Sequence, residues 1–171
     1  MDFMTLAKER YSVRDYKDTP IEEEKLQKIL EAGRIAPTAK NNQAYRVYVL
    51  KSEAAVAKIR ELSRCAFNAP IVLLFTYNKD EEWFNTKEED YRSGQEDASI
   101  VATHMMLQAQ ELEIGSCWVN VFPPSEVIEA FDIPANERPV LLMPIGYPSD
   151  KSVPSERHTL YRDMEELVKV L

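Results

Sequence analysis

The stretch Arg10-Tyr11-Ser12-Val13-Arg14-Asp15-Tyr16, followed one helix later by Ala36-Pro37-Thr38-Ala39-Lys40-Asn41-Asn42-Gln43, carries most of the information in this sequence. The first segment places two guanidinium groups and a hydroxyl within five residues. The second supplies hydroxyl and amide groups at a turn that a proline interrupts. Together they suit a phosphate and a flat polar ring, and the ordered pair is a far stronger signal than either segment alone.

The length and composition of the chain suit a single domain, which we expect to cover residues 1–171. Hydrophobic residues make up 44% and charged residues 29%, as in a soluble globular protein. The longest apolar run, residues 70–75, is much shorter than a membrane-spanning helix. The first ten residues mix charged and apolar positions, unlike a signal peptide. We therefore expect a cytoplasmic protein with no membrane partner.

The chain is acidic, with a formal net charge of -8 at pH 7. General nucleic-acid binding relies on clustered basic residues that replace phosphate counterions, so we expect no nucleic-acid partner. One short segment is basic instead, because it contains Lys8, Arg10, Arg14 and Lys17, which outnumber the acids between them. This segment is the place to look for a bound phosphate.

Several common sites are excluded by their motifs. The chain has only four glycines, so neither G-x-G-x-x-G nor G-x-x-x-x-G-K-S/T occurs, and no Rossmann or P-loop nucleotide site is expected. Cys65 and Cys117 lack C-x-x-C spacing and fit buried, reduced thiols. His104 and His158 form no H-E-x-x-H pair, and His104 fits a core position better than a catalytic triad. We therefore expect no metal site.

The hydrophobic pattern predicts an α+β domain without internal repeats. In chain order, we expect helices over 2–10 and 20–36, a strand over 46–50, a helix over 53–64, a strand over 71–77, an exposed loop or lid over 78–94, a long helix over 95–113, a short strand over 115–120, a helix over 124–131, a strand over 140–147, and a helix or extended tail over 163–171. The long helix is apolar around nearly its whole circumference, so it should be buried on most sides.

The basic segment has two interpretations. Arg10 and Arg14 offer charge-assisted, bidentate contacts to a phosphate, and the Ser12 hydroxyl can support them. Because the chain has so few glycines, side chains would have to make most of the contacts with the phosphate. The alternative is a solvated charged turn after the first helix.

The polar residues of the segment 36–43 and of the short strand 115–120 each have a structural and a functional interpretation. Thr38, Asn41 and Gln43 follow a helix end, where they commonly satisfy backbone groups, but their amides also match the donors and acceptors of an isoalloxazine rim. Trp118 fits a core position. Asn120 is flanked by apolar residues and needs a hydrogen-bond partner.

Taken in order, these elements resemble the nitroreductase family of FMN-dependent oxidoreductases, particularly its short members. The resemblance runs through four segments: Arg10 to Tyr16, Ala36 to Gln43, the long helix closing into Leu112 to Trp118, and Pro144 to Pro148. It implies a central, mostly antiparallel sheet flanked by helices, and a homodimer with the flavin at the subunit interface. A dimer would also give the long apolar helix a second face to bury.

The resemblance further implies which residues bind FMN. Arg10, Ser12 and Arg14 would hold the phosphate, ribityl chain and pyrimidine edge, and the turn after Pro37 would approach the same flavin from the second subunit. The segment from Trp118 to Val121 would line the ring, with a backbone N–H facing the flavin N5. The expected cofactor-binding set is Arg10, Tyr11, Ser12, Arg14, Pro37, Thr38, Ala39, Asn41, Gln43, Trp118, Val119, Asn120, Val121 and Arg162.

Two departures from the family pattern affect this set. The chain reads Gln43-Ala44-Tyr45 where relatives usually follow the N-x-Q with proline and an aromatic residue. Near the C-terminus, where the family places a basic pair for the phosphate, Arg162 is the candidate and Arg157 the fallback.

The implied function is a ping-pong transfer of hydride from NAD(P)H through the FMN N5 to a nitroaromatic, quinone or similar electrophile. Because the flavin carries the redox chemistry, no catalytic acid or base is expected from the chain. Three alternatives stay open: an FMN-binding storage or sensor protein, a dehalogenating or flavin-fragmenting relative, and a cofactor-free interaction domain. The acceptor and the choice of NADH or NADPH are not readable, since the residues that would select the acceptor fall in 78–94 and at Ala44-Tyr45.

Overall fold

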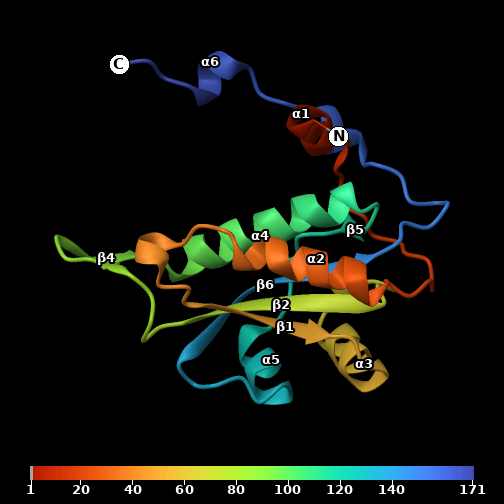
Figure 1. Ribbon diagram of the computed structural model, residues 1–171, viewed down its shortest axis with the longest axis horizontal. Helices are drawn as coiled ribbons and strands as arrows, with labels where there is room; N and C mark the ends of the chain where they lie inside the picture. Colours follow the sequence, from red (N-terminus) through yellow and green to blue (C-terminus); the bar gives the residue numbers. More distant parts are fainter. Residues whose placement is uncertain (1) are drawn as a thin grey trace.

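A computed structural model describes residues 2–171, apart from the side chain of Glu89. At its centre is a four-stranded sheet in the order β1-β2-β6-β5 (Figure 1). The strands are β1 (Tyr45–Leu50), β2 (Ile71–Asn78), β6 (Glu137–Gly146) and β5 (Gly115–Ser116). All three neighbouring pairs run antiparallel, which confirms the predicted mostly antiparallel sheet.

Helices cover both faces of the sheet (Figure 1). One face carries α2 (Glu23–Arg34) and α4 (Gly94–Glu111), and the other carries α3 (Glu53–Leu62) and α5 (Pro124–Ala130). Two short helices, α1 (Phe3–Glu9) and α6 (Met164–Leu167), lie outside these layers, beyond α4. These bounds agree with the sequence prediction to within a few residues at most ends.

Strand β2 shows why the sheet is covered on both faces. Leu73 and Phe75 belong to the apolar cluster under α2 and α4, whereas Val72 and Leu74 belong to the cluster under α3 and α5. Successive side chains on a strand point to opposite faces, so a continuous apolar run requires cover on both. All four of these side chains are fully buried.

Helices α2 and α4 approach each other closely at Gly33. A Cβ atom at this position would lie 2.6 Å from the Met105 Sδ and 3.2 Å from a Val101 methyl group. Only glycine leaves room for this approach, which fixes the C-terminal end of α2 against α4.

One face of α4 is partly exposed. Its buried stripe includes Val101 and Met105, but Ile100 is 38% exposed and Thr103 is also exposed. His104, expected in the core, is only half-buried, and its Nδ1 lies 2.9 Å from the Ile100 carbonyl oxygen. Ile100 and Thr103 thus lie on a narrow exposed strip, whereas most of the helix is buried or half-buried, as the sequence predicted.

The segment 78–94 is only partly the exposed loop that its charge predicted. It forms a two-stranded hairpin from β3 (Phe84–Asn85) and β4 (Glu88–Arg92). At the base of the hairpin, Glu82 and Ser93 are buried. The Glu82 carboxylate accepts a hydrogen bond from the Gly94 N–H (3.0 Å), which supplies the polar partner that burial requires.

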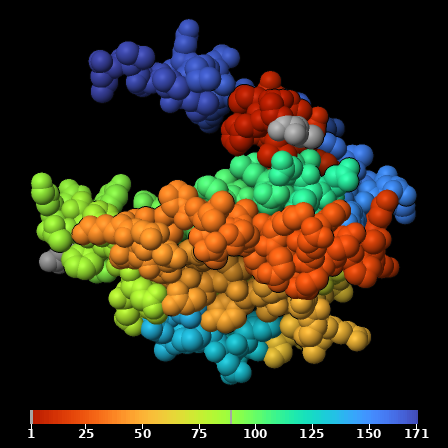
Figure 2. Space-filling model, viewed as in Figure 1, coloured from red at the N-terminus to blue at the C-terminus, as the bar shows by residue number. Residues whose placement is uncertain are grey.

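The C-terminal tail leaves the body of the molecule after β6 and passes α1 (Figures 1 and 2). It contains a short 3₁₀ helix, η3 (Glu156–Thr159), and then α6. Its apolar side chains are each at least 52% exposed; they are Leu160, Tyr161, Met164, Leu167, Val168, Val170 and Leu171. Among the described residues, no helix has the length and apolar character needed to cross a bilayer.

Candidate functional site

The basic segment after α1 is fixed to the edge of the sheet. Ser12 forms a parallel bridge with Ser116, and the Val13 N–H donates to the Ser116 carbonyl (3.0 Å). The Tyr16 hydroxyl donates to the carbonyl oxygens of Val13 (2.7 Å) and Pro144 (3.1 Å), and burial raises the pKa of this phenol. Val13 and Tyr16 are thus buried anchors, while the polar residues between and before them are half-buried or, at Arg14, exposed.

Arg10, Ser12 and Arg14 all act on the thiol of Cys117, the residue that follows β5. Burial raises the pKa of the Cys117 thiol, while Arg14, the Ser12 hydroxyl and Arg10 each lower it in part. Arg14 is exposed, and its Nη1 donates to the Ser12 carbonyl oxygen (3.2 Å). The two predicted guanidinium groups and the hydroxyl therefore belong to one short segment that is fixed beside β5 and lies within electrostatic reach of one thiol.

The predicted ring-lining segment runs alongside β6. Val119 exchanges two backbone hydrogen bonds with Leu142, both 2.9 Å. The Asn120 side chain accepts from the Trp118 indole N–H (2.8 Å) and donates to the Val140 carbonyl (2.8 Å). The partner that Asn120 needed is supplied within the same edge of the sheet, so its amide orders this segment.

A hollow of about 550 Å³ adjoins this segment. It is lined by Leu62, Ser63, Arg64, Asn120, Val121, Phe122 and Pro123. Arg64 begins the short 3₁₀ helix η2 (Arg64–Ala66) and places a third cation beside two residues of the predicted set. Sequence reasoning missed Arg64, although it was the basic residue closest before the buried strand β2.

The second predicted segment forms a tight turn around the 3₁₀ helix η1 (Ala39–Asn41). Thr38 holds it from within: its hydroxyl accepts from the Gln43 N–H (3.1 Å), and its carbonyl accepts from the Asn41 N–H (2.9 Å). Lys40, Asn41 and Gln43 all have positive φ, between 50° and 56°. Each such residue costs roughly 1–2 kcal/mol, so the surrounding structure must hold the turn in place.

Two contacts supply that support from outside the turn. The Ala39 N–H donates to the Asp97 carboxylate (2.8 Å), and the Asn42 side chain donates to the Glu81 carbonyl (3.0 Å). Asp97 was also missed in the sequence. Its signal was an acid on the buried stripe of the long helix, at helical spacing from Val101 and Met105.

The two predicted segments lie at opposite ends of the molecule. The turn contacts the first helical turn of α4, whereas the basic segment pairs with β5, which follows the last turn (Figure 1). An α-helix of 18 residues such as α4 is roughly 27 Å long. One chain therefore does not bring Arg10 and Thr38 to the same ligand.

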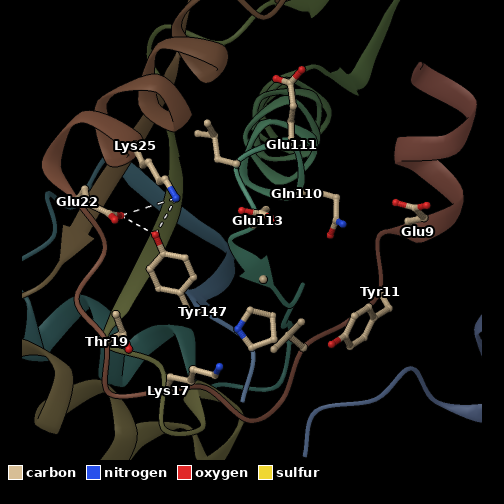
Figure 3. Close-up of a pocket in the computed structure, with 14 residues that line it drawn as sticks. Glu9, Tyr11, Lys17, Thr19, Glu22, Lys25, Gln110, Glu111, Glu113 and Tyr147 are labelled. Atoms are coloured by element: carbon tan, nitrogen blue, oxygen red, sulfur yellow. Dashed lines mark hydrogen bonds and ion pairs between the residues drawn. The ribbon is translucent and has the colours of Figure 1, made fainter. Parts of the chain in front are cut away.

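The larger cavity, of about 1030 Å³, lies elsewhere (Figure 3). Between α1, the start of α2 and the end of α4, Figure 3 shows Lys25 and Glu22 meeting at the Tyr147 hydroxyl. That hydroxyl accepts from the Lys25 Nζ (2.8 Å) and donates to Glu22 (2.6 Å). Of the predicted site residues, Tyr11 lines this cavity, and the others do not.

The C-terminal arginines lie on the tail. Arg162 is exposed and forms an ion pair with Glu166 (3.8 Å). Arg157 is in η3, where the neighbouring His158 contacts the Lys8 carbonyl (2.9 Å) and packs edge-on against Tyr11. The tail thus passes the basic segment at its start and then departs from it.

Comparison with known proteins identifies the family. The family model for the nitroreductase family matches residues 7–68 and 63–147. A nitroreductase family protein of Clostridium difficile 630 is 37% identical over 99% of this chain and 98% of its own, with a TM-score of 0.92. An FMN-dependent nitroreductase of C. difficile R20291 is 27% identical over 94% and 99% of the two chains, with a TM-score of 0.72. The FMN reductase (NAD(P)H) of Bacillus subtilis is 29% identical, over 85% of this chain and 66% of that protein. The chain belongs to the nitroreductase family.

Proposed function

We propose that this chain is an FMN-dependent oxidoreductase that uses NAD(P)H to reduce a nitroaromatic, quinone or similar electrophile. The observation that carries the proposal is that the segment with Arg10, Ser12 and Arg14 is bridged to Ser116, next to the segment 118–121, in a nitroreductase family chain. The two relatives named for FMN, one of them also for NAD(P)H, support the choice of cofactor and reductant.

The donor set of this edge fits FMN. A phosphate needs cationic or N–H donors, and the flavin pyrimidine edge carries acceptors that guanidinium groups can meet. Arg10, Arg14 and Arg64 supply three cations, and Ser12 supplies a hydroxyl. Since the Asn120 amide is already engaged by Trp118 and Val140, we assign contact with the ring to the backbone of residues 118–121 rather than to this side chain.

We further propose that two copies of the chain complete the site as a homodimer. Pro37, Thr38, Ala39, Asn41 and Gln43 lie at the end of α4 remote from the basic segment, so they would serve the flavin held by the other copy. Arg162, on the departing tail, would also act on the partner's site.

The exposed apolar surface supports the second copy. Besides the tail, Phe3 and Met4 on α1 are 65% and 59% exposed, and Ile100 lies on the open face of α4. Figure 2 shows an open gap between the tail and the surface formed by α2 and α4. Monomeric proteins rarely expose large apolar patches, and an isologous dimer would cover these side chains.

Bound FMN supplies the hydride and electron transfer, and the chain would bind it, orient it and tune it. The guanidinium groups of Arg10, Arg14 and Arg64 would stabilise negative charge on the cofactor. Val119, fixed to β6 by its paired hydrogen bonds, would hold the ring-lining backbone rigid. We propose no acid or base from the chain.

The test is the visible absorption spectrum of the purified protein before and after anaerobic addition of NADH or NADPH. The proposal predicts flavin bands that bleach on addition. Bands that persist with both reductants would indicate another electron donor or a storage protein. A colourless protein that takes up no added FMN would refute the proposal.

A further inference from the structure

Asp97 is a buried acid that belongs to neither predicted segment. Its side chain is 2% exposed and lies on the face of α4 that also carries Val101 and Met105, both fully buried. A carboxylate in such surroundings must be satisfied by hydrogen bonds. Asp97 has one on each oxygen: Oδ1 accepts from the Ala39 N–H (2.8 Å), and Oδ2 accepts from the Ser93 hydroxyl (2.8 Å).

These two bonds join three parts of the chain. The Ala39 N–H belongs to the turn 37–43, and Asp97 belongs to the first turn of α4. Ser93 lies at the base of the hairpin, where its hydroxyl also accepts from the Trp83 N–H (3.2 Å). The carboxylate is therefore a shared anchor for the turn, the helix and the hairpin.

The turn needs such an anchor because its backbone is strained. Three of the four residues from Lys40 to Gln43 have positive φ, and Thr38 accepts two of the hydrogen bonds within the turn. Strained conformations persist only where the surrounding structure determines them. Removing the acceptor at Asp97 would leave the Ala39 N–H without its partner and free the turn to relax.

We propose that Asp97 is the positioning residue of the turn 37–43, which it holds in the strained shape that presents Thr38 and Asn41 to the cofactor. The expected effect of Asp97 on FMN binding rests on the proposed function, because the turn would contact FMN only if the chain binds it. The anchoring itself is a property of the cofactor-free chain.

The first arm of the test measures hydrogen–deuterium exchange of the full-length protein without added FMN. In Asp97→Ala, peptides covering residues 37–44 should exchange at least tenfold faster than in the wild type. Asp97→Asn should restore most of the protection, because an amide oxygen can accept from Ala39 and the amide N–H can donate to Ser93. Unchanged exchange in Asp97→Ala would overturn the anchoring.

The control is Glu137→Ala, which removes another buried carboxylate with two hydrogen bonds, from the Tyr48 hydroxyl (2.9 Å) and the Thr76 hydroxyl. Glu137 makes no bond to the turn in the described structure, so its loss should lower thermal stability without selectively exposing residues 37–44. Equal exposure of the turn in both variants would show that Asp97 acts only through general stability, and would overturn the proposal.

The second arm titrates FMN into each variant and follows flavin fluorescence. The dissociation constant should rise about tenfold or more in Asp97→Ala, less in Asp97→Asn, and less than twofold in Glu137→Ala. Unchanged affinity in Asp97→Ala, despite a loosened turn, would overturn the positioning role. If the wild type binds no FMN while the exchange result holds, the proposed function fails and the anchoring by Asp97 stands.

Discussion

The two ends of α4 are built in different ways. At its C-terminal end, the segment from Arg10 to Tyr16 is held by ordinary means: a bridge to the sheet and two buried side chains, Val13 and Tyr16. At its N-terminal end, the turn 37–43 is strained and is held by single hydrogen bonds, notably from Ala39 to Asp97. One end presents cations from a segment paired with the sheet, and the other presents small polar groups from a turn that two hydrogen bonds, to Asp97 and to Glu81, hold from outside.

This difference indicates how the proposed site is divided. Cations bind a phosphate more tightly when the backbone that carries them is held in place, because electrostatic binding is stronger when the donors are already positioned. The turn would complete a site on another copy of the chain, since α4 keeps it roughly 27 Å from its own basic segment. The following predictions test the division, from the largest expected effect to the smallest.

Deleting residues 160–171 should have the largest effect, because it removes the exposed apolar side chains of the tail. Burying a large apolar side chain contributes about 1.5–3 kcal/mol, so the loss of several should weaken a dimer by more than about 100-fold. Light scattering after gel filtration would measure the mass in solution. Glu165→Gln with Glu166→Gln, which alters only exposed charges of the tail, should remain dimeric. A truncated chain that stays dimeric would show that the tail is not part of the interface.

Arg10→Ala should weaken FMN binding by about 10- to 100-fold, since a charge-assisted hydrogen bond contributes about 1.5–3 kcal/mol. Fluorescence titration of FMN would measure the affinity. The control is Arg138→Ala, because Arg138 is an exposed arginine that lies at the far end of β6 and donates to nearby backbone carbonyls. Normal flavin content in Arg10→Ala would count against the assignment of the basic segment.

Asn120→Ala should destabilise the ring-lining segment by about 0.5–1.5 kcal/mol, because it removes the two hydrogen bonds that an exposed amide makes to the Trp118 N–H and the Val140 carbonyl. Urea denaturation, with tryptophan fluorescence as the probe, would measure this. The turn 37–43 is remote from these bonds, so its hydrogen exchange should not change. A stability equal to that of the wild type would mean that water or neighbouring groups replace the amide.

The smallest effect concerns how stability depends on pH through Tyr48, whose hydroxyl donates to Glu137 (2.9 Å). Glu137 lies opposite Asn78 at the end of the sheet nearest the turn 37–43. Burial, with the hydrogen bond to Glu137, raises the pKa of Tyr48 to about 12 from its usual 10. Between these values the unfolded chain releases the phenolic proton while the folded chain keeps it, so stability falls as the pH rises. Tyr48→Phe should lose less stability between pH 10 and 12 than the wild type. Identical slopes of the urea midpoint against pH would contradict this.

The sequence predicted most of the fold because its signals are local. The period of β2 and of the helices follows from side-chain geometry along one segment, and Arg10, Ser12 and Arg14 are close in the chain itself. The base of the hairpin was missed because Glu82 and Ser93 are polar residues whose partners become visible only after folding. Asp97 was missed for the same reason, since its bond to Ala39 joins residues 58 positions apart.

The central claim is that each FMN site takes its cations from one chain and its turn from another. The direct test mixes two differently tagged chains, Arg10→Ala and a triple variant with Thr38, Asn41 and Gln43 all changed to alanine, and isolates the hybrid dimer. The hybrid should bind one FMN per dimer with wild-type affinity, because one of its two sites is intact, while both parents should bind FMN more weakly at both sites. A hybrid that binds no FMN with wild-type affinity, although the wild type binds two per dimer, would contradict the claim and place both segments at a site within one chain.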